Sequence, residues 1–232
     1  MNSKKLILLS AILALLLMPA ANITAQTKNA EHIIVYHEVG KFTGWPANNG
    51  ACTSMWLLLH DDLADPNATD PILRQSTRVC AAAVYAGQTS IDPPVINEWI
   101  PSTDPMHRMI PYAVGQQSMA NVWPHAHYES KYKVTYQEFS PINHLDANDP
   151  PLYMEYNRGM KLPAANAGDA IHHPMFGIKM WEKSNTKAAG HECHLRITST
   201  NEYKSTTTAS YANGVDFLID KLLAPVSAKP EK

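Results

Sequence analysis

Several features that mark common protein classes are scarce in this chain. It has three cysteines in 232 residues, Cys52, Cys80 and Cys193. Three thiols cannot form the multi-bridge framework of a small secreted domain, and each lies in an apolar stretch, so buried free thiols are expected. Basic and acidic residues are nearly balanced, 19 against 21, without a basic cluster. This balance argues against nucleic-acid binding.

Long apolar runs are also missing, except at the start of the chain. Residues 1–25 read MNSKKLILLSAILALLLMPAANITA, in which Lys4 and Lys5 precede an apolar core and alanines follow it. The core is shorter than the roughly 20 residues that span a bilayer. The segment therefore predicts a cleaved signal peptide and a secreted or periplasmic protein. Nothing later in the chain suggests stable membrane insertion.

The rest of the chain suits one globular domain in which strands and helices alternate. Strands are expected at residues 32–36, 79–86, 151–156 and 192–197, and helices at 51–60, 70–78, 171–190 and 213–223. This alternation predicts an α/β fold with a mostly parallel sheet covered by helices. Residues 102–140 suggest a long irregular loop or cap, and residues 225–232 a disordered tail.

Apolar patterning indicates which faces of these elements are buried. The run VCAAAVYA at 79–86 is typical of a strand covered on both faces. In the helix at 171–190, Phe176 and Met180 lie one turn apart, and Gly190 is expected to close it. The last helix is expected to turn Phe217, Leu218, Ile219, Leu222 and Leu223 toward a core.

Five blocks of sequence from Gly50 to Leu223 occur in an order that resembles exported α/β-hydrolases of the acyl-esterase type. They are GACTSMWLLLHDDLADP (50–66), DPILRQSTR (70–78), VCAAAVYAGQTSIDP (79–93), HLDANDPPLYMEY (144–156) and IHHPMFGIKMWEK (171–183). The resemblance implies a partial α/β-hydrolase fold over residues 50–224, with the front strands missing. Its first block corresponds to the helix after the nucleophile.

The segment before Gly50 has a different resemblance. HIIVYHEVGKFTGWPANNG at 32–50 is similar to the opening of secreted sialidase-like β-propeller proteins. Residues 26–49 are therefore interpreted as a leader segment with one strand, fused to the truncated hydrolase-like domain. A divergent hydrolase whose front half has eroded is the alternative.

The resemblance implies a catalytic serine in a G-x-S-x-G turn, an acid and a histidine. If Gly50 closes that turn, Asn48 occupies the serine position, and a carboxamide cannot be activated as a nucleophile. The aspartate expected after the strand 151–156 is replaced by NRGM, and the loop 198–214 contains no histidine. The sequence thus predicts an esterase-like protein with impaired or no catalysis, a pseudoenzyme.

Four residues remain as candidates for the old pocket, namely Asn49, Asp149, His172 and His173. Asp149 precedes Pro150 and is more typical of a turn. His172 and His173 begin an expected helix and belong to a matched block, so they suit either the mouth of the pocket or a helix cap.

Cofactors and metals are not expected. The histidines at 125–127, 172–173 and 191–194 lack the i, i+4 spacing of a helical zinc motif. Three functions stay open: an ester hydrolase relative, a non-catalytic protein that binds a small ester or carbohydrate-derived ligand, and one half of a two-chain hydrolase. Missing front strands predict exposed apolar surface on the helix 51–60, which favours a homodimer or a complementing chain.

Overall fold

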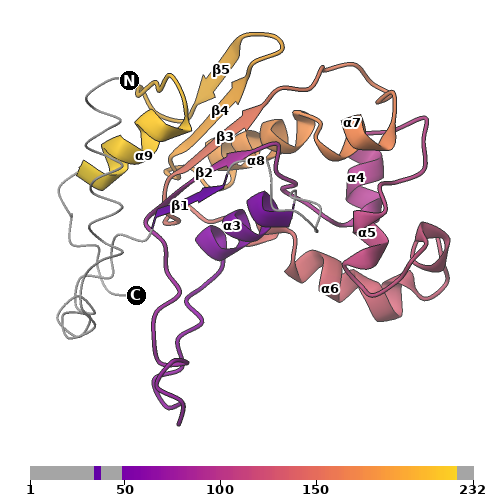
Figure 1. Ribbon diagram of the computed structural model, residues 1–232, viewed down its shortest axis with the longest axis horizontal. Coiled ribbons are helices and arrows are strands. Elements are labelled where there is room, and N and C mark those ends of the chain that lie inside the picture. The colour runs from indigo at the N-terminus through magenta and orange to yellow at the C-terminus, as the bar shows by residue number, and fades with distance from the viewer. Residues whose placement is uncertain (1–33, 38–48, 224–232) are drawn as a thin grey trace. The chain divides into compact units, whose positions relative to one another are not determined.

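The computed structural model describes residues 34–37 and 49–223. Its centre is a five-stranded sheet in the order β1-β2-β3-β4-β5 (Figure 1). The strands are β1 (Ile34–His37), β2 (Ala81–Tyr85), β3 (Leu152–Tyr156), β4 (Cys193–Ile197) and β5 (Glu202–Ser205). The first four are parallel and β5 pairs antiparallel with β4. The predicted α/β class and mostly parallel sheet are confirmed, whereas β5 was not predicted.

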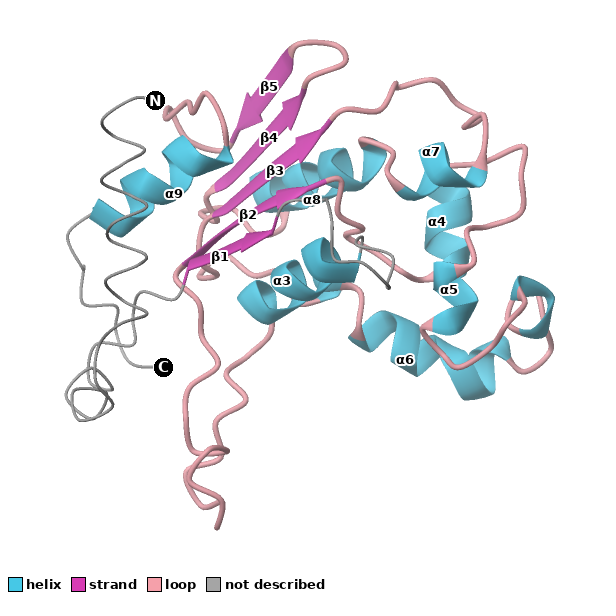
Figure 2. Ribbon diagram, in the orientation of Figure 1, coloured by secondary structure: helices cyan, strands magenta, loops and turns pink. Residues whose placement is uncertain are grey.

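Helices lie on both faces of this sheet (Figure 2). They are α3 (Asn49–Leu59), α4 (Pro93–Trp99), α5 (Met109–Tyr112), α6 (Lys133–Glu138), α7 (Ala167–Ile171), α8 (Met175–Thr186) and α9 (Gly214–Leu223). Shorter turns are η3 (Met119–Asn121), η4 (Tyr128–Tyr132) and η5 (Pro141–Asn143). We call the side with α3 and α8 the broad face and the side with α9 the narrow face. The predicted cap at 102–140 consists largely of the short elements α5 to α6.

The side chains of β2 show how one strand serves both faces. Ala82 and Val84 belong to the broad-face core, and Ala81 and Ala83 belong to the narrow-face core. All four are fully buried. Alternation of side chains along a strand produces this split. A strand covered on both faces, as the apolar run predicts, is confirmed.

Two glycines permit close contact between helices and the sheet. A Cβ atom on Gly177 of α8 would lie 2.5 Å from Tyr156 Cε2. A Cβ atom on Gly87, just after β2, would lie 2.9 Å from Ala51 Cβ in α3. Any side chain at either position would push its helix outward, so glycine sets the spacing of this layer.

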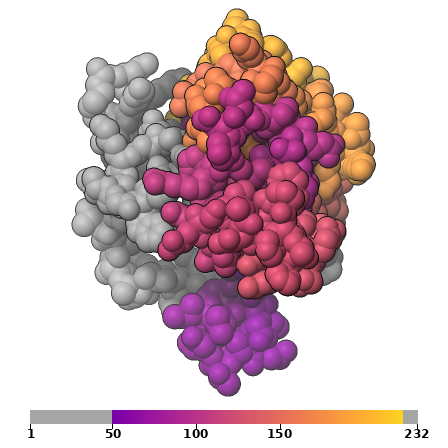
Figure 3. All heavy atoms as spheres, turned by 90° about the vertical axis from the view of Figure 1, so that its right-hand side faces the viewer, coloured from indigo at the N-terminus to yellow at the C-terminus, as the bar shows by residue number. Residues whose placement is uncertain are grey.

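The predicted helix at 70–78 is wrong. These residues form turns: Ile72 N donates to Asp70 Oδ1 at 2.8 Å and Gln75 N donates to Ile72 O at 3.0 Å. They lie in the loop between α3 and β2, which stands away from the sheet (Figures 1 and 3). Ile72 is 74% exposed, so a short helix here has no core to pack against and is not stable.

The single helix predicted at 171–190 is two helices. α7 ends at Ile171 and α8 begins at Met175, after Pro174 at its N-cap. A residue before proline avoids the helical region, which explains the break at His173. α8 ends at Thr186, before Gly190. Phe176 and Met180 are fully buried, as their spacing predicts.

Two further predictions, about which apolar side chains of α9 and α3 are buried, are corrected by their exposed fractions. In α9, Phe217 and Leu218 are buried, but Leu222 and Leu223 are 42% and 75% exposed and face away from the core. In α3, the apolar side chains expected on the surface are buried: Ala51, Met55, Leu58 and Leu59 are at most 3% exposed. α3 packs against β1, β2 and η5, which supply the cover that the sequence could not reveal.

Predictions for the ends of the chain are not tested. The signal peptide, most of the leader and the tail after Leu223 lie outside the described residues. Within the described ranges, β1 is the one strand that precedes α3. No helix in those ranges has the length and apolar character to cross a membrane. None of the three cysteines forms a disulfide; Cys193 is buried, and Cys52 and Cys80 are half-buried.

Candidate functional site

A groove of about 460 Å³ lies between α3, α5 and the loop that follows β2. Its walls are mainly apolar, from Trp56, Ile91, Met109, Ile110, Phe139 and Ile171, with Cys52, Thr53, Gln88, Arg108, Tyr112 and Ala113 completing the lining. Gln88 and Ile91 come directly after the carboxyl end of β2. Ligands of open α/β sheets bind in crevices outside the carboxyl ends of the strands. The groove therefore occupies the position where this class of fold holds small molecules.

Two polar side chains in the groove wall already donate hydrogen bonds to backbone carbonyls. Gln88 Nε2 donates to Ile171 O at 2.7 Å and joins the loop after β2 to α7. The Cys52 thiol donates to Phe139 O, with Sγ 3.8 Å from the oxygen. Burial raises the pKa of Cys52 to about 12. The thiol stays protonated at neutral pH and is not a nucleophile there.

His172 lies at the same edge of the sheet. Its Nδ1 is 3.0 Å from the carbonyl oxygen of Ala86, which can only accept, so Nδ1 donates. Burial lowers the pKa of His172 more than this bond raises it, and the ring is neutral at pH 7. Ala86 has φ 48°, a left-handed conformation that costs roughly 1–2 kcal/mol in a non-glycine residue. The bond from His172 helps to hold this strained residue at the end of β2.

His173 and His107 adopt different roles beside it. His173 is buried, and its Nδ1 accepts from Met175 N at 3.1 Å, which caps the first turn of α8. Burial lowers the pKa of His173. Burial and the nearby His172 both lower the pKa of His107, which stands on the cap segment. Of the alternatives left open for the two adjacent histidines, capping fits His173, and His172 is the one nearer the groove through its neighbour Ile171.

The other candidates do not join these histidines. Asp149 accepts a hydrogen bond from Asp146 N at 2.7 Å in a turn before β3, at the amino edge of the sheet. That edge is opposite the one that carries His172. Asn49 is the first residue of α3, and Asn48 lies outside the described residues.

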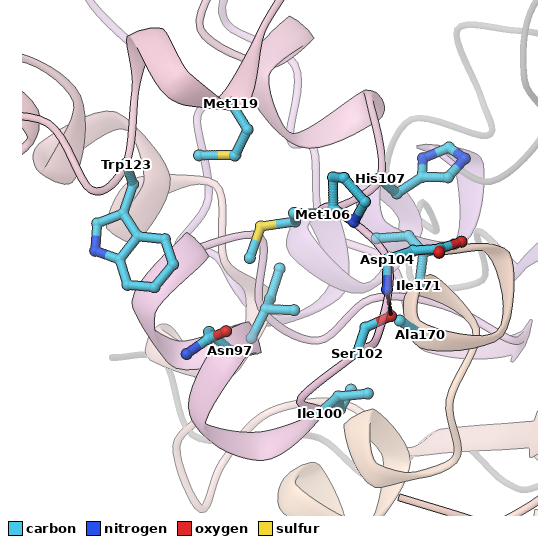
Figure 4. Close-up of a pocket in the computed structure, with 12 residues that line it drawn as sticks. Asn97, Ile100, Ser102, Asp104, Met106, His107, Met119, Trp123, Ala170 and Ile171 are labelled. Atoms are coloured by element: carbon cyan, nitrogen blue, oxygen red, sulfur yellow. Dashed lines mark hydrogen bonds between the residues drawn. The ribbon is translucent and has the colours of Figure 1, made fainter. Parts of the chain in front are cut away.

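A second cavity, of about 240 Å³, lies under the cap segment and shares Ile171 with the groove. Figure 4 shows Met106, Met119 and Trp123 around it, with His107 at one side. Asp104 N donates to Ser102 Oγ at 3.2 Å, drawn as a dashed line. The cavity is smaller than the groove, and its lining mixes apolar side chains with Asn97, Ser102, Asp104 and His107.

One serine and histidine pair has the geometry of a nucleophile and its base, but in the wrong place. Ser184 Oγ lies 2.9 Å from His191 Nδ1, and His191 Nε2 lies 3.0 Å from Pro150 O. The Ser184 hydroxyl also lies within bonding distance of Met180 O, and both residues are buried. Because the pair sits at the amino edge inside the core, it ties α8 to the sheet. Among the described residues that line the groove there is no serine and no histidine.

Sequence reasoning missed most of what the fold brings together. The groove combines Trp56, Ile110 and Phe139 from three separate segments. A cluster of His60, Glu138 and His144 likewise has no local spacing that would reveal it. The one available signal was the aromatic and methionine-rich character of residues 102–140, which suggested a cap over the sheet.

Comparison with known proteins adds no family assignment. The chain matches no protein-family model, and searches of curated proteins and of solved structures found no significant match.

Proposed function

We propose that this chain is an exported, catalytically silent relative of the α/β-hydrolases that binds a small acyl ligand in the groove. The observation that carries the proposal is an apolar groove at the carboxyl edge of a mostly parallel sheet, with neither histidine nor serine among the lining residues that the structure describes. Such a site has the shape and chemistry of a small-molecule pocket without the groups for acyl transfer.

The order of elements supports the hydrolase part of the proposal. β1, α3, β2, β3, α8, β4 and α9 follow one another as the later strands and helices of that fold are expected to do. α3 begins at Asn49, directly after the position that corresponds to the catalytic serine. The residues after β3 are Asn157 and Arg158, so the position expected to hold the acid carries no carboxylate.

The groove wall indicates the class of ligand. Its larger part is apolar, which suits an acyl chain. Arg108 is exposed and is the one charged side chain among the lining residues in the described ranges. A guanidinium at the rim of an apolar groove is complementary to a carboxylate or an ester carbonyl. A medium-chain fatty acid or its ester combines both features, and it is the ligand we propose.

Calorimetric titration of the chain with octanoate tests this proposal. Saturable binding is expected, and Ala113→Trp should weaken it at least about tenfold because the indole fills part of the groove from an exposed position. Ala120→Trp places the same ring on the same cap segment outside the groove lining and should leave the affinity unchanged. Arg108→Gln should weaken octanoate about two- to fivefold, as an exposed ion pair does, and leave octanol unaffected.

Two results would contradict the proposal. Octanoate that fails to bind saturably, or that binds equally to the chain with Ala113→Trp, would remove the groove as its site. Steady turnover of p-nitrophenyl acetate, or a covalent adduct with a fluorophosphonate probe, would show that the chain is catalytic.

A second candidate function is one half of a two-chain hydrolase. It is favoured by the position of β1, which is an edge of the sheet in the described part of the chain. A partner strand at this edge would supply the front of the fold. Esterase activity that appears only when the chain is co-expressed with the product of a neighbouring gene would support this candidate over the first.

A further inference from the structure

Three side chains with metal-ligating atoms meet where three segments end. His60 follows the last residue of α3, Glu138 is the last residue of α6, and His144 follows η5. One ligand atom from each lies within 4.8 Å of the other two. His60 Nε2 is 3.2 Å from Glu138 Oε1, and the two imidazole centroids are 4.8 Å apart.

The indole of Trp56 holds this cluster together. Its Nε1 donates to the backbone oxygen of Glu138 at 2.9 Å, which ties α3 to the end of α6. The indole also packs against the ring of His60, with centroids 4.4 Å apart. His60 N donates to Trp56 O at 2.8 Å and so continues the hydrogen bonding of α3. The backbone at His60 and at Glu138 is thus fixed by bonds that do not use the carboxylate of Glu138.

Backbone carbonyls determine which nitrogen of each histidine carries hydrogen. His60 Nδ1 is 2.8 Å from Asp61 O, and His144 Nε2 is 2.5 Å from Glu138 O. A carbonyl oxygen only accepts, so these nitrogens donate, and in a neutral ring the other nitrogen has a lone pair. His60 Nε2 then faces the carboxylate of Glu138. At 3.2 Å the two atoms are bridged either by a proton on Nε2, which makes an ion pair, or by a cation that both atoms bind.

We propose that His60, Glu138 and His144 bind a transition-metal dication, with Zn²⁺ as the best fit. Two imidazole nitrogens and one carboxylate are donors that zinc prefers, whereas calcium and magnesium require oxygen ligands. Histidines that bind metals use their second ring N–H in a bond to a carbonyl or carboxylate, and His60 has this arrangement, with Nδ1 bonded to Asp61 O and Nε2 toward Glu138. The geometry of the donors and the bonds behind them point to the same class of ion.

Exposure leaves room for the rest of the coordination sphere. The side chain of Glu138 is 46% exposed and that of His60 is 20% exposed, so water completes the site. Tetrahedral zinc holds its ligand atoms roughly 3.4 Å apart, which is closer than the limit of 4.8 Å observed here. Rotation of the exposed Glu138 side chain would bring the ligand atoms to this spacing when zinc binds. Trp56 lines the groove, but none of the three ligand residues is among its described lining, so the site does not depend on the proposed acyl ligand.

Calorimetric titration of the chain with Zn²⁺ tests the proposal, using protein purified without a histidine tag and treated with EDTA. One ion per chain is expected, and His60→Ala combined with His144→Ala should weaken binding at least about 100-fold. His125→Ala combined with His127→Ala is the matched control. Those two exposed rings are 5.0 Å apart and belong to no three-ligand cluster in the described residues, so zinc affinity should not change.

Glu138→Gln gives a second variant that keeps the fold, because this side chain is exposed and its bond from Trp56 uses the backbone. It should weaken zinc at least about tenfold, and millimolar Mg²⁺ should not compete with zinc for the original chain. Unchanged affinity in Glu138→Gln would overturn the proposal, as would loss of binding in the control pair. Thermal unfolding of each variant, followed by circular dichroism, shows whether a lost signal reflects lost structure.

Discussion

The two faces of the sheet are stabilised by different forces. The broad face buries a continuous apolar core that includes Met55, Leu152, Phe176 and Met180. The core of the narrow face consists of Ala81, Ala83, Tyr153, Phe217 and Leu218. There, α9 is joined to the sheet by charged groups as well, since Lys221 Nζ lies 2.6 Å from Glu192 Oε1.

Around this ion pair the narrow face forms a connected polar network. Glu192 Oε1 is 2.9 Å from Nε2 of the buried His194, and His194 Nδ1 is 2.9 Å from the Tyr203 hydroxyl. Burial alone would raise the pKa of Glu192, but its bonds with His194 and Lys221 outweigh burial and lower it. Because the narrow face buries few apolar side chains, α9 is held to the sheet partly by polar groups that satisfy one another's hydrogen bonds. Each face should therefore lose most stability to a different kind of substitution.

The largest effect is expected on the broad face. Phe176→Ala should lower the free energy of unfolding by about 3–5 kcal/mol, because it leaves a cavity at a fully buried position. Urea denaturation followed by circular dichroism measures this loss. Phe139→Ala, at a position 47% exposed, is the control and should cost less than about 1 kcal/mol. Equal losses in the two variants would contradict the assignment of Phe176 to the buried core of the broad face.

A smaller loss is expected on the narrow face. Glu192→Ala should cost about 2–3 kcal/mol, since it leaves Lys221 and His194 without their shared partner in a partly buried site. Adding Lys221→Met should recover part of that loss, because no unpaired charge then remains under α9. Urea midpoints of the single and double variants decide the point. A double variant less stable than the sum of the single changes would argue against it.

The smallest expected effect is on the pH dependence of folding stability, because different groups titrate in different pH ranges. The pKa values of His107, His172 and His173 are lowered, so these side chains bind fewer protons in the folded chain than in the unfolded one. Stability from them is complete above about pH 6.5 and declines as pH falls below it. The lowered pKa of Glu192 acts later, because its contribution is lost only below about pH 4.3.

Urea midpoints from pH 7.5 to 3.5 should therefore fall in two stages. His172→Gln should flatten the upper stage and leave the lower one, and Glu192→Gln should do the reverse. A His172→Gln chain with an unchanged slope between pH 6.5 and 5 would show that this ring does not couple folding to protons.

Local patterns were sufficient for the four parallel strands, but not for β5 or for the site. The apolar run around Ala81 to Val84 and the pair Phe176 and Met180 report burial through their own spacing, and the structure confirms them. Leu222 and Leu223 continue the apolar pattern of α9 but extend past the sheet, so their exposure depends on where the sheet ends. That is a property of the tertiary structure.

The groove and the His60 cluster depend on contacts between distant segments in the same way. His60 lies close to Glu138 only because Trp56 binds the backbone at the end of α6. No spacing within one segment encodes such a meeting. The catalytic assignments from the resemblance concern Asn48 and the loop after β4, and they stay predictions that the binding and labelling experiments test.

The absence of a side chain at Gly87 has a consequence for both proposals. This position sets how near α3 comes to β2, and α3 carries Cys52 and Trp56 on the wall of the groove and His60 beyond its last turn. A single methyl group there would displace the helix, and with it the two proposed binding sites, which share no ligand. Acyl affinity and zinc affinity would then change together, so a residue that touches neither ligand would couple them.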